Sequence, residues 1–169
     1  MKILVTGGSG YIGSVTTELL CNDGHEVTVF DNLERGHREA VDPRARLIVG
    51  DLRSPDGIRD AMQSVKPDAV VHFAAYALVG ESMQEPHLYF ENNVGGGLNL
   101  LDAMQRTGVK KIIFSSTCAT YGEPDVVPMT EVLLQRPTNP YGESKLMLET
   151  VLRWAQERNG IQPVFLRYF

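Results

Sequence analysis

The 169-residue sequence is poor in cysteine and lacks any pattern of metal ligands, which excludes two classes of small domain. Its only cysteines, Cys21 and Cys118, lie far apart and form neither a disulfide framework nor a ligand pair. The four histidines show no ligand spacing either, so no metal site is predicted. Without a disulfide framework or a signal peptide, the sequence predicts a cytoplasmic protein.

Long apolar runs and an excess of positive charge are also missing. The longest apolar run, from Ala69 to Val79, is interrupted by His72 and is too short to cross a bilayer. The formal net charge is −5 at pH 7, and no long basic stretch is present. Nucleic acid and anionic membranes are therefore poor candidates for partners. The length suffices for one domain with a sizeable core.

A glycine-rich stretch near the N-terminus follows the first apolar run. Lys2 to Thr6 has the continuous apolar centre of a strand buried on both faces, and helical spacing of apolar residues begins at about Tyr11. The intervening strand-to-helix turn holds Gly7, Gly8, Gly10 and Gly13. Glycines could serve here only to make the turn, but they also let a phosphate approach the free N–H groups and positive dipole end of a helix. We therefore expect a dinucleotide pyrophosphate here.

The acidic residue Asp31 supports this interpretation. It ends the second apolar run, Glu26 to Phe30, about 20 residues beyond the glycines, where a carboxylate binds the adenosine ribose in dinucleotide-binding folds. A carboxylate at that position repels a 2′-phosphate, so Asp31 favours NAD over NADP. We interpret the following Arg35 and Arg38 as members of a solvated loop.

Strand and helix patterns alternate along the rest of the chain. Strands are predicted at 2–6, 26–30, 46–49, 68–73, 111–115 and 164–167, and helices from about 11 and at 55–65, 87–107 and 139–159. This alternation predicts an α/β fold with a doubly wound parallel sheet, the Rossmann arrangement. We expect six strands in the order 3-2-1-4-5-6, helices on both faces, and ligand at the carboxyl ends of strands one and four.

Three glycines interrupt the helix predicted at 87–107. Each of Gly95, Gly96 and Gly97 costs a helix about 1 kcal/mol relative to alanine. Close packing of another backbone or a ligand would explain them, and a simple interruption of the helix would explain them equally well.

Tyr141 and Lys145 are one helical turn apart, so their side chains are neighbours. A nearby ammonium lowers the pKa of a phenol, which can then take a proton from an alcohol while hydride leaves the same carbon. Thr117, in the hydroxyl-rich end of the fifth strand, could hold and relay that proton. A Tyr-x-x-x-Lys pair arises readily by chance, but after the glycine turn and Asp31 it points to redox chemistry on an alcohol. The pair continues an inward-facing stripe formed by Leu148, Leu152 and Ala155.

Several short motifs together resemble the extended short-chain dehydrogenase/reductase family, with the greatest similarity to its UDP-sugar 4-epimerases. The resemblance extends over all 169 residues. The motifs are Thr6–Gly13, Asp31–Leu33, Gly50–Arg53, His72–Ala75, Val79–Ser82, Asn92–Val94, Ser115–Thr117, Tyr141-x-x-x-Lys145 and Leu166–Phe169.

The resemblance implies NAD as the cofactor and assigns its contacts. Tyr11 and Ile12 would bind the pyrophosphate through their N–H groups, and Phe169 would abut the nicotinamide side. Asp31 would bind the adenosine ribose, and Asp51 and Leu52 would contact the adenine. The full set of implied cofactor residues is Gly7, Gly10, Tyr11, Ile12, Gly13, Asp31, Asn32, Asp51, Leu52, Phe73, Ala74, Ala75, Ala77, Asn93, Lys145 and Phe169.

The resemblance also implies a reaction and an assembly. Family members take hydride from C4 of the UDP-sugar, let the 4-ketose turn over, and return hydride to its other face. Tyr141 would be the base and, with Thr117, would contact the substrate, while Lys145 would bond the nicotinamide ribose and tune Tyr141. Members commonly dimerise through helices that here begin near His87 and Asn139, so a homodimer of the whole protein is expected.

The chain departs from the family pattern at a few points. Ala77 replaces a lysine that some members carry, and Thr117 replaces a serine. Members continue past Arg-Tyr-Phe with a segment that holds the nucleotide of the substrate, so residues 1–169 are expected to form an NAD-binding domain without its substrate domain.

Two other functions remain open alternatives. One is a stand-alone NAD-binding module without turnover. The other is a nucleotide-sugar 4,6-dehydratase, which is disfavoured because Cys118 and Ala119 stand where dehydratases place an Asp-Glu pair. The sequence does not choose between a hexose and a pentose.

Overall fold

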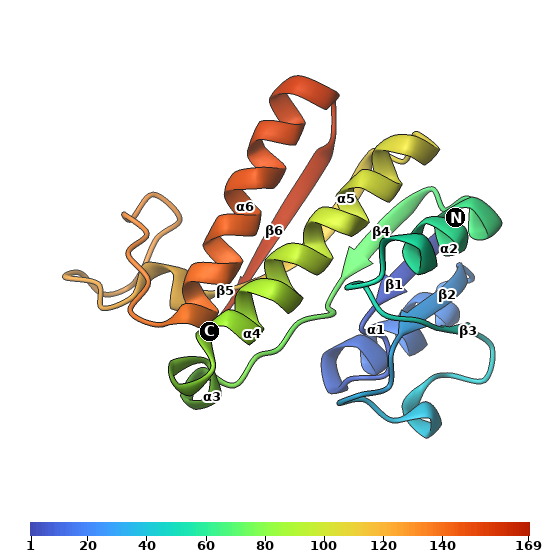
Figure 1. The fold of residues 1–169 in the computed structure, drawn as a ribbon, viewed down its shortest axis with the longest axis horizontal. Helices are drawn as coiled ribbons and strands as arrows, with labels where there is room; N and C mark the ends of the chain where they lie inside the picture. The colour runs from blue at the N-terminus through green and yellow to red at the C-terminus, as the bar shows by residue number, and fades with distance from the viewer.

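A six-stranded parallel sheet forms the centre of the computed structural model, which describes residues 1–169 (Figure 1). The order β3-β2-β1-β4-β5-β6 confirms the predicted order, and every neighbouring pair of strands is parallel. The strands are β1 (Lys2–Thr6), β2 (Glu26–Asp31), β3 (Arg46–Val49), β4 (Ala69–His72), β5 (Lys111–Thr117) and β6 (Gln162–Tyr168).

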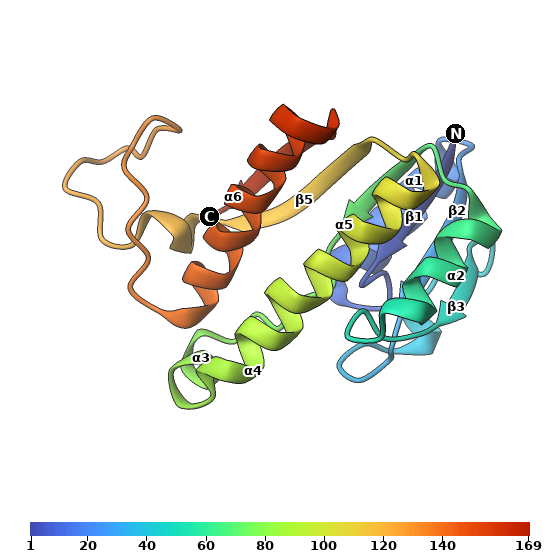
Figure 2. The ribbon, with the colours of Figure 1, turned by 45° about the horizontal axis from the view of Figure 1, so that its top comes forward.

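Helices cover the two faces of this sheet unequally (Figures 1 and 2). The helices are α1 (Tyr11–Asn22), α2 (Pro55–Val65), α3 (Val79–Gln84), α4 (Pro86–Tyr89), α5 (Gly96–Thr107) and α6 (Pro140–Asn159). Short 3-10 segments are η1 (Arg38–Ala40) and η3 (Cys118–Tyr121), and a π-helical segment, η2 (Phe90–Gly95), joins α4 to α5. None of these helices combines the length and the apolar character that a bilayer-spanning helix needs.

The larger core lies between one sheet face and the helices α2, α5 and α6. Ile58 of α2, Leu100 of α5 and Leu152 of α6 are almost completely buried there, against Phe30 and Phe114 of the sheet. Burial of such side chains contributes about 1.5–3 kcal/mol each to stability. The smaller core on the opposite face includes valines of β1, β2 and β4 and is covered by α1.

The opposite face of β5 and β6 carries no helix. Ile113, Val164 and Leu166 are therefore 38–52% exposed, although they lie in regular strands. The alternation of exposed and half-buried residues along β6 follows from this one-sided cover, since successive side chains of a strand point to opposite faces.

The sequence located the long elements within a few residues, including the helical stretch predicted at 87–107, but it did not predict the π-helical segment within that stretch. Helical structure begins at Pro86 and passes through the π-helical segment η2 before it continues as α5. The sequence analysis also missed α3, which has only six residues and little periodicity. Both differences concern short segments, where local pattern carries the least information.

Two of the three consecutive glycines in this region have close neighbours. A Cβ on Gly97 would lie 2.5 Å from Cδ2 of Leu148 in α6, and a Cβ on Gly96 would lie 3.0 Å from Cβ of Leu52. Gly95 has nothing within 4 Å of such an atom. Close packing therefore accounts for Gly96 and Gly97, and it brings α5 against α6.

The contrast between Gly97 and Gly95 predicts opposite effects of the same substitution. Gly97→Ala forces the buried Leu148 to move and should lower the free energy of unfolding by about 1–3 kcal/mol. The methyl group added by Gly95→Ala meets open space on a helical backbone, so this variant should raise the free energy of unfolding by up to about 1 kcal/mol. Urea unfolding of both variants measures the difference, and equal stabilities would contradict the packing explanation.

Candidate functional site

The turn from β1 into α1 can be built only with glycine at two of its positions. Gly7 has φ of +75°, and a Cβ there would lie 2.4 Å from the backbone nitrogen of Ala74. A Cβ on Gly13 would lie 2.1 Å from the carbonyl oxygen of Gly7. The turn therefore packs directly on the chain that leaves β4, at the carboxyl edge of the sheet.

The helix that follows this turn presents an uncapped N-terminus. Gly10 is its N-cap and offers no side-chain acceptor, and the first turn contains no acidic residue. Tyr11 and Ile12, the first two helical residues, have no acceptor for their N–H groups within the helix. Such an end attracts an anion through its free donors and its dipole.

A cleft opens beside this turn, at the carboxyl ends of β1, β2, β3 and β4. Its lining includes many of the residues that the sequence analysis assigned to the cofactor: Gly7, Gly10, Asp31, Asn32, Asp51, Leu52, Phe73, Ala74 and Ala75. It also includes residues that the sequence analysis missed, namely Phe30, Glu34, Arg35, Gly36, Gly50, Tyr76 and Asn92. Glu34, Arg35, Gly36 and Tyr76 lie within five residues of the ends of β2 and β4, and that position is the signal that could have identified them.

Asp31 is fixed by backbone donors on both sides. Its Oδ2 accepts a hydrogen bond from the N–H of Ser9 at 3.0 Å, and its Oδ1 accepts one from the N–H of Leu33 at 2.9 Å. The residue is only 8% exposed. These bonds hold the carboxylate between the glycine turn and the loop after β2, so its position in the cleft is rigid.

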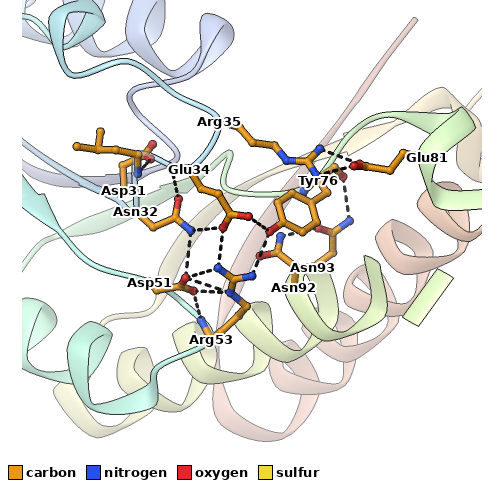
Figure 3. Close-up of polar contacts among 11 residues, drawn as sticks. Asp31, Asn32, Glu34, Arg35, Asp51, Arg53, Tyr76, Glu81, Asn92 and Asn93 are labelled. Atoms are coloured by element: carbon orange, nitrogen blue, oxygen red, sulfur yellow. Dashed lines mark hydrogen bonds and ion pairs between the residues drawn. The ribbon is translucent and has the colours of Figure 1, made fainter. Parts of the chain in front are cut away.

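Charged and hydroxyl side chains join the loops on either side of the cleft (Figure 3). Glu34, in the loop after β2, accepts hydrogen bonds from the Tyr76 hydroxyl at 2.7 Å and from Arg53 at 2.7 Å. Arg53 also donates to Tyr76 and to Asp51, and the amide of Asn32 donates to Asp51 at 3.1 Å. The bonds from Arg53 lower the pKa of Asp51 to about 2, so this carboxylate is ionised at neutral pH.

Arg35 belongs to the same set of contacts across the cleft. Its interpretation as a residue of a solvated loop is therefore corrected. Its guanidinium makes two hydrogen bonds of 2.8 Å to Glu81 of α3 and lies 3.8 Å from the centre of the Tyr76 ring (Figure 3). The hydroxyl of Tyr89 donates to the same Glu81 at 2.6 Å. Although exposed, Arg35 thus ties the loop after β2 to α3.

The structure brings Tyr141, Lys145 and Thr117 together where α6 begins and β5 ends. Lys145 is only 3% exposed, and its Nζ donates to the carbonyl oxygen of Ser115 at 2.9 Å. The same Nζ lies 5.9 Å from the centre of the Tyr141 ring and 5.0 Å from that of Phe114. Burial lowers the pKa of Lys145 to about 7.

The predicted effect of Lys145 on Tyr141 is not seen in this arrangement. Burial raises the pKa of Tyr141, and the Thr117 hydroxyl opposes that rise only in part. Lys145 bonds the Ser115 carbonyl, and with a pKa near 7 its amine is only partly protonated at neutral pH. Burial therefore favours the neutral forms of both groups.

Some of the predicted cofactor residues lie away from the lining of the cleft. Ala77 is exposed, and Phe169 is 80% exposed at the end of the chain. Asn93 is buried behind the cleft, where its side-chain amide bonds the backbone of Tyr76 and the hydroxyl of Ser144 in α6. Asn93 therefore links the loop after β4 to the helix that carries Tyr141 and Lys145.

Known proteins are similar to this chain in sequence and in fold. The model of the family described as NAD dependent epimerase/dehydratase matches residues 3–169. A UDP-glucose 4-epimerase of Lacticaseibacillus casei is 53% identical over 169 residues, which are 100% of this chain and 51% of that protein. One of Corynebacterium glutamicum is 48% identical over the same share of this chain and 51% of its own length.

Solved structures give the same result. The crystal structure of UDP-glucose 4-epimerase from Brucella ovis in complex with NAD matches with a TM-score of 0.97 at 45% identity, covering 99% of this chain and 51% of that one. The enzyme from Bifidobacterium longum in complex with NAD+ and UDP matches with a TM-score of 0.96 at 37% identity, covering 100% and 53%. The chain thus spans about half the length of the relatives it matches.

The lowered pKa of Lys145 predicts a particular dependence of stability on pH. The pKa falls from 10.5 in the unfolded chain to about 7 in the folded one, so the unfolded chain binds more protons between these values. The cost of burying the ammonium is fully present below pH 7 and is relieved as the pH rises. The free energy of unfolding of the wild type, measured relative to that of Lys145→Met, should therefore rise by about 1.4 kcal/mol per pH unit between pH 7 and 10.

Urea unfolding of both proteins at several values between pH 6 and 10 measures this difference, in which the other titrating groups cancel. A difference that does not change with pH would show that Lys145 keeps its ordinary pKa.

Proposed function

The chain belongs to the NAD-dependent epimerase/dehydratase family, and from that premise we propose that it is the NAD-binding portion of a UDP-glucose 4-epimerase. The observation that carries this proposal is the grouping of Tyr141, Lys145 and Thr117 next to a cleft lined by Asp31 and a glycine turn. The names of the most similar relatives support the choice of reaction.

The residues of the cleft fit a dinucleotide. The uncapped start of α1 offers free N–H groups to a pyrophosphate, and the turn leaves no room for a side chain at Gly7 or Gly13. The fixed carboxylate of Asp31 can accept hydrogen bonds from two ribose hydroxyls and disfavours a 2′-phosphate. Asp51 and Leu52 lie further along the cleft, on the side that we assign to the adenine.

The reacting end of the cofactor lies, in this proposal, beside α6. When bound there, NAD would supply the hydride acceptor for oxidation at C4 of the sugar and the hydride donor for the return step. Tyr141 exchanges the proton of the C4 hydroxyl, and Thr117 holds that hydroxyl in place. Lys145 would bond the nicotinamide ribose, which gives its buried amine a second polar partner besides the Ser115 carbonyl. Phe169 closes the nicotinamide side.

The proposed assembly is a homodimer of the whole protein, formed through α5 and α6. Leu98 of α5 is 45% exposed and Met147 of α6 is 41% exposed, which supports a contact between helices there.

For the substrate, we propose a UDP-hexose, in line with the relatives' names. Cys118 and Ala119 lie directly after Thr117, so the pair of carboxyl groups expected of a dehydratase is absent there.

Binding of NAD by the 169-residue chain should depend on Asp31. Asp31→Ala removes the acceptor for both ribose hydroxyls and should weaken NAD binding at least about tenfold, because each charge-assisted hydrogen bond contributes about 1.5–3 kcal/mol. The preference for NAD over NADP should also fall, because the repulsion of the 2′-phosphate is gone. Titration calorimetry on protein freed of bound nucleotide measures both effects.

The control is Asp42→Ala, because Asp42 pairs with Arg44 outside the cleft. Equal affinities for NAD in the wild type and both variants would contradict the assignment of Asp31. A folded wild type that binds no NAD would contradict the proposed cofactor site.

Turnover should depend on Tyr141 in the whole protein. Tyr141→Phe removes the hydroxyl that exchanges the proton and should lower the kcat for epimerisation of UDP-galactose at least about a thousandfold. NAD affinity should change little, because the ring stays in place. A variant with near wild-type kcat would contradict this role, and a wild type that binds NAD but turns over no UDP-sugar would favour a binding module.

A further inference from the structure

Glu149 is a completely buried carboxylate for which the proposed chemistry has no role. It lies on α6, one turn beyond Lys145 and two turns beyond Tyr141, on the same face of the helix. A buried carboxylate is costly unless it is paired and hydrogen-bonded, so its partners indicate what it does in the fold.

The partners of Glu149 come from three other segments of the chain. Its Oε1 accepts hydrogen bonds from the Ser116 hydroxyl at 2.5 Å and from Nε of Arg167 at 3.0 Å. Its Oε2 accepts from Nη2 of Arg167 at 2.7 Å and from Arg153, on the next turn of α6, at 2.9 Å. Gln135, in the loop before α6, contributes a longer bond of 3.4 Å.

Two of these segments, β5 and β6, lead to residues of the proposed reacting centre. Ser116 directly precedes Thr117 in β5, and Arg167 lies two residues before Phe169 in β6. Arg167 also donates to the hydroxyl of Tyr121, in the turn that follows Thr117. The helix α6 packs against both β5 and β6 and runs alongside β6 in Figure 1. Through Ser116 and Arg167, one carboxylate connects this helix to the ends of both strands.

We propose that Glu149 is a positioning residue for the nicotinamide half of the site. It holds the helix with Tyr141 and Lys145 at a fixed distance from Thr117 and from the end of β6. This inference rests on the proposed function, because it takes these residues to surround the nicotinamide.

The chemistry of the cluster favours a role in geometry. The bond to Arg167 uses both carboxylate oxygens and two guanidinium nitrogens, which fixes direction as well as distance. Burial alone would raise the pKa of Glu149, but the bonds from Arg167 and Ser116 outweigh it and lower that pKa. The carboxylate is therefore ionised, and loss of its charge would leave the half-buried Arg167 without its counter-ion.

The test compares two ligands that probe different halves of the cleft. AMP reaches only the side of Asp31 and Asp51, while NADH also reaches the side of Lys145, and its fluorescence reports on the surroundings of the nicotinamide. Glu149→Gln should weaken NADH binding about tenfold and reduce the fluorescence enhancement of bound NADH, with AMP affinity unchanged. Glu149→Asp keeps the charge and should restore most of both signals.

Glu157→Gln is the matched control, because it makes the same chemical change at an exposed position of α6. The positioning role would be overturned if Glu149→Gln weakened the binding of AMP and of NADH equally, or changed neither affinity. Loss of a purely stabilising residue would not affect the two affinities differently. If Glu149→Gln does not fold, Ser116→Ala is the alternative variant, because it removes only the hydrogen bond between Glu149 and β5. It should still weaken NADH binding about threefold and leave the affinity for AMP unchanged.

The outcomes also separate this inference from the proposed function. A folded wild type that binds neither ligand would refute the cofactor site itself. A wild type that binds both, with variants that bind both equally well, would refute only the role of Glu149.

Discussion

The parallel pairing of β1 with both β2 and β4 is the constraint on which the rest of the structure depends. From β1 the chain moves outward in one direction to β2 and β3, and it then returns across β1 to continue outward through β4, β5 and β6. The helices that follow β1 and β4 therefore cover opposite faces of the sheet, and a cleft remains at the carboxyl edge where the two directions meet. The glycine turn, Asp31 and the residues after β4 line that cleft because the strand order places them there.

The sequence predicted those parts of the site whose geometry is local. The glycine turn, the carboxylate at the end of β2 and the pair Tyr141 and Lys145 depend only on short spacing within one element or one turn. The pairing of Arg35 with Glu81 and that of Glu149 with Arg167 join residues far apart in sequence, so no spacing rule reveals them.

The pKa of Tyr141 shows another limit of local pattern. Proximity to Lys145 follows from helical spacing, but the depth of burial follows from the packing of α6 on β5 and η3. A pattern that places two side chains next to each other gives no measure of how far both are removed from water. Desolvation then decides the direction of the shift.

The side chains that join the two walls of the cleft also restrain the movement of those walls. Glu34 and Arg35 reach from the loop after β2 to Tyr76 and Glu81 beyond β4. The two walls can move further apart only when these bonds break. Any widening of the cleft is therefore restrained by surface side chains that lie outside the reacting centre.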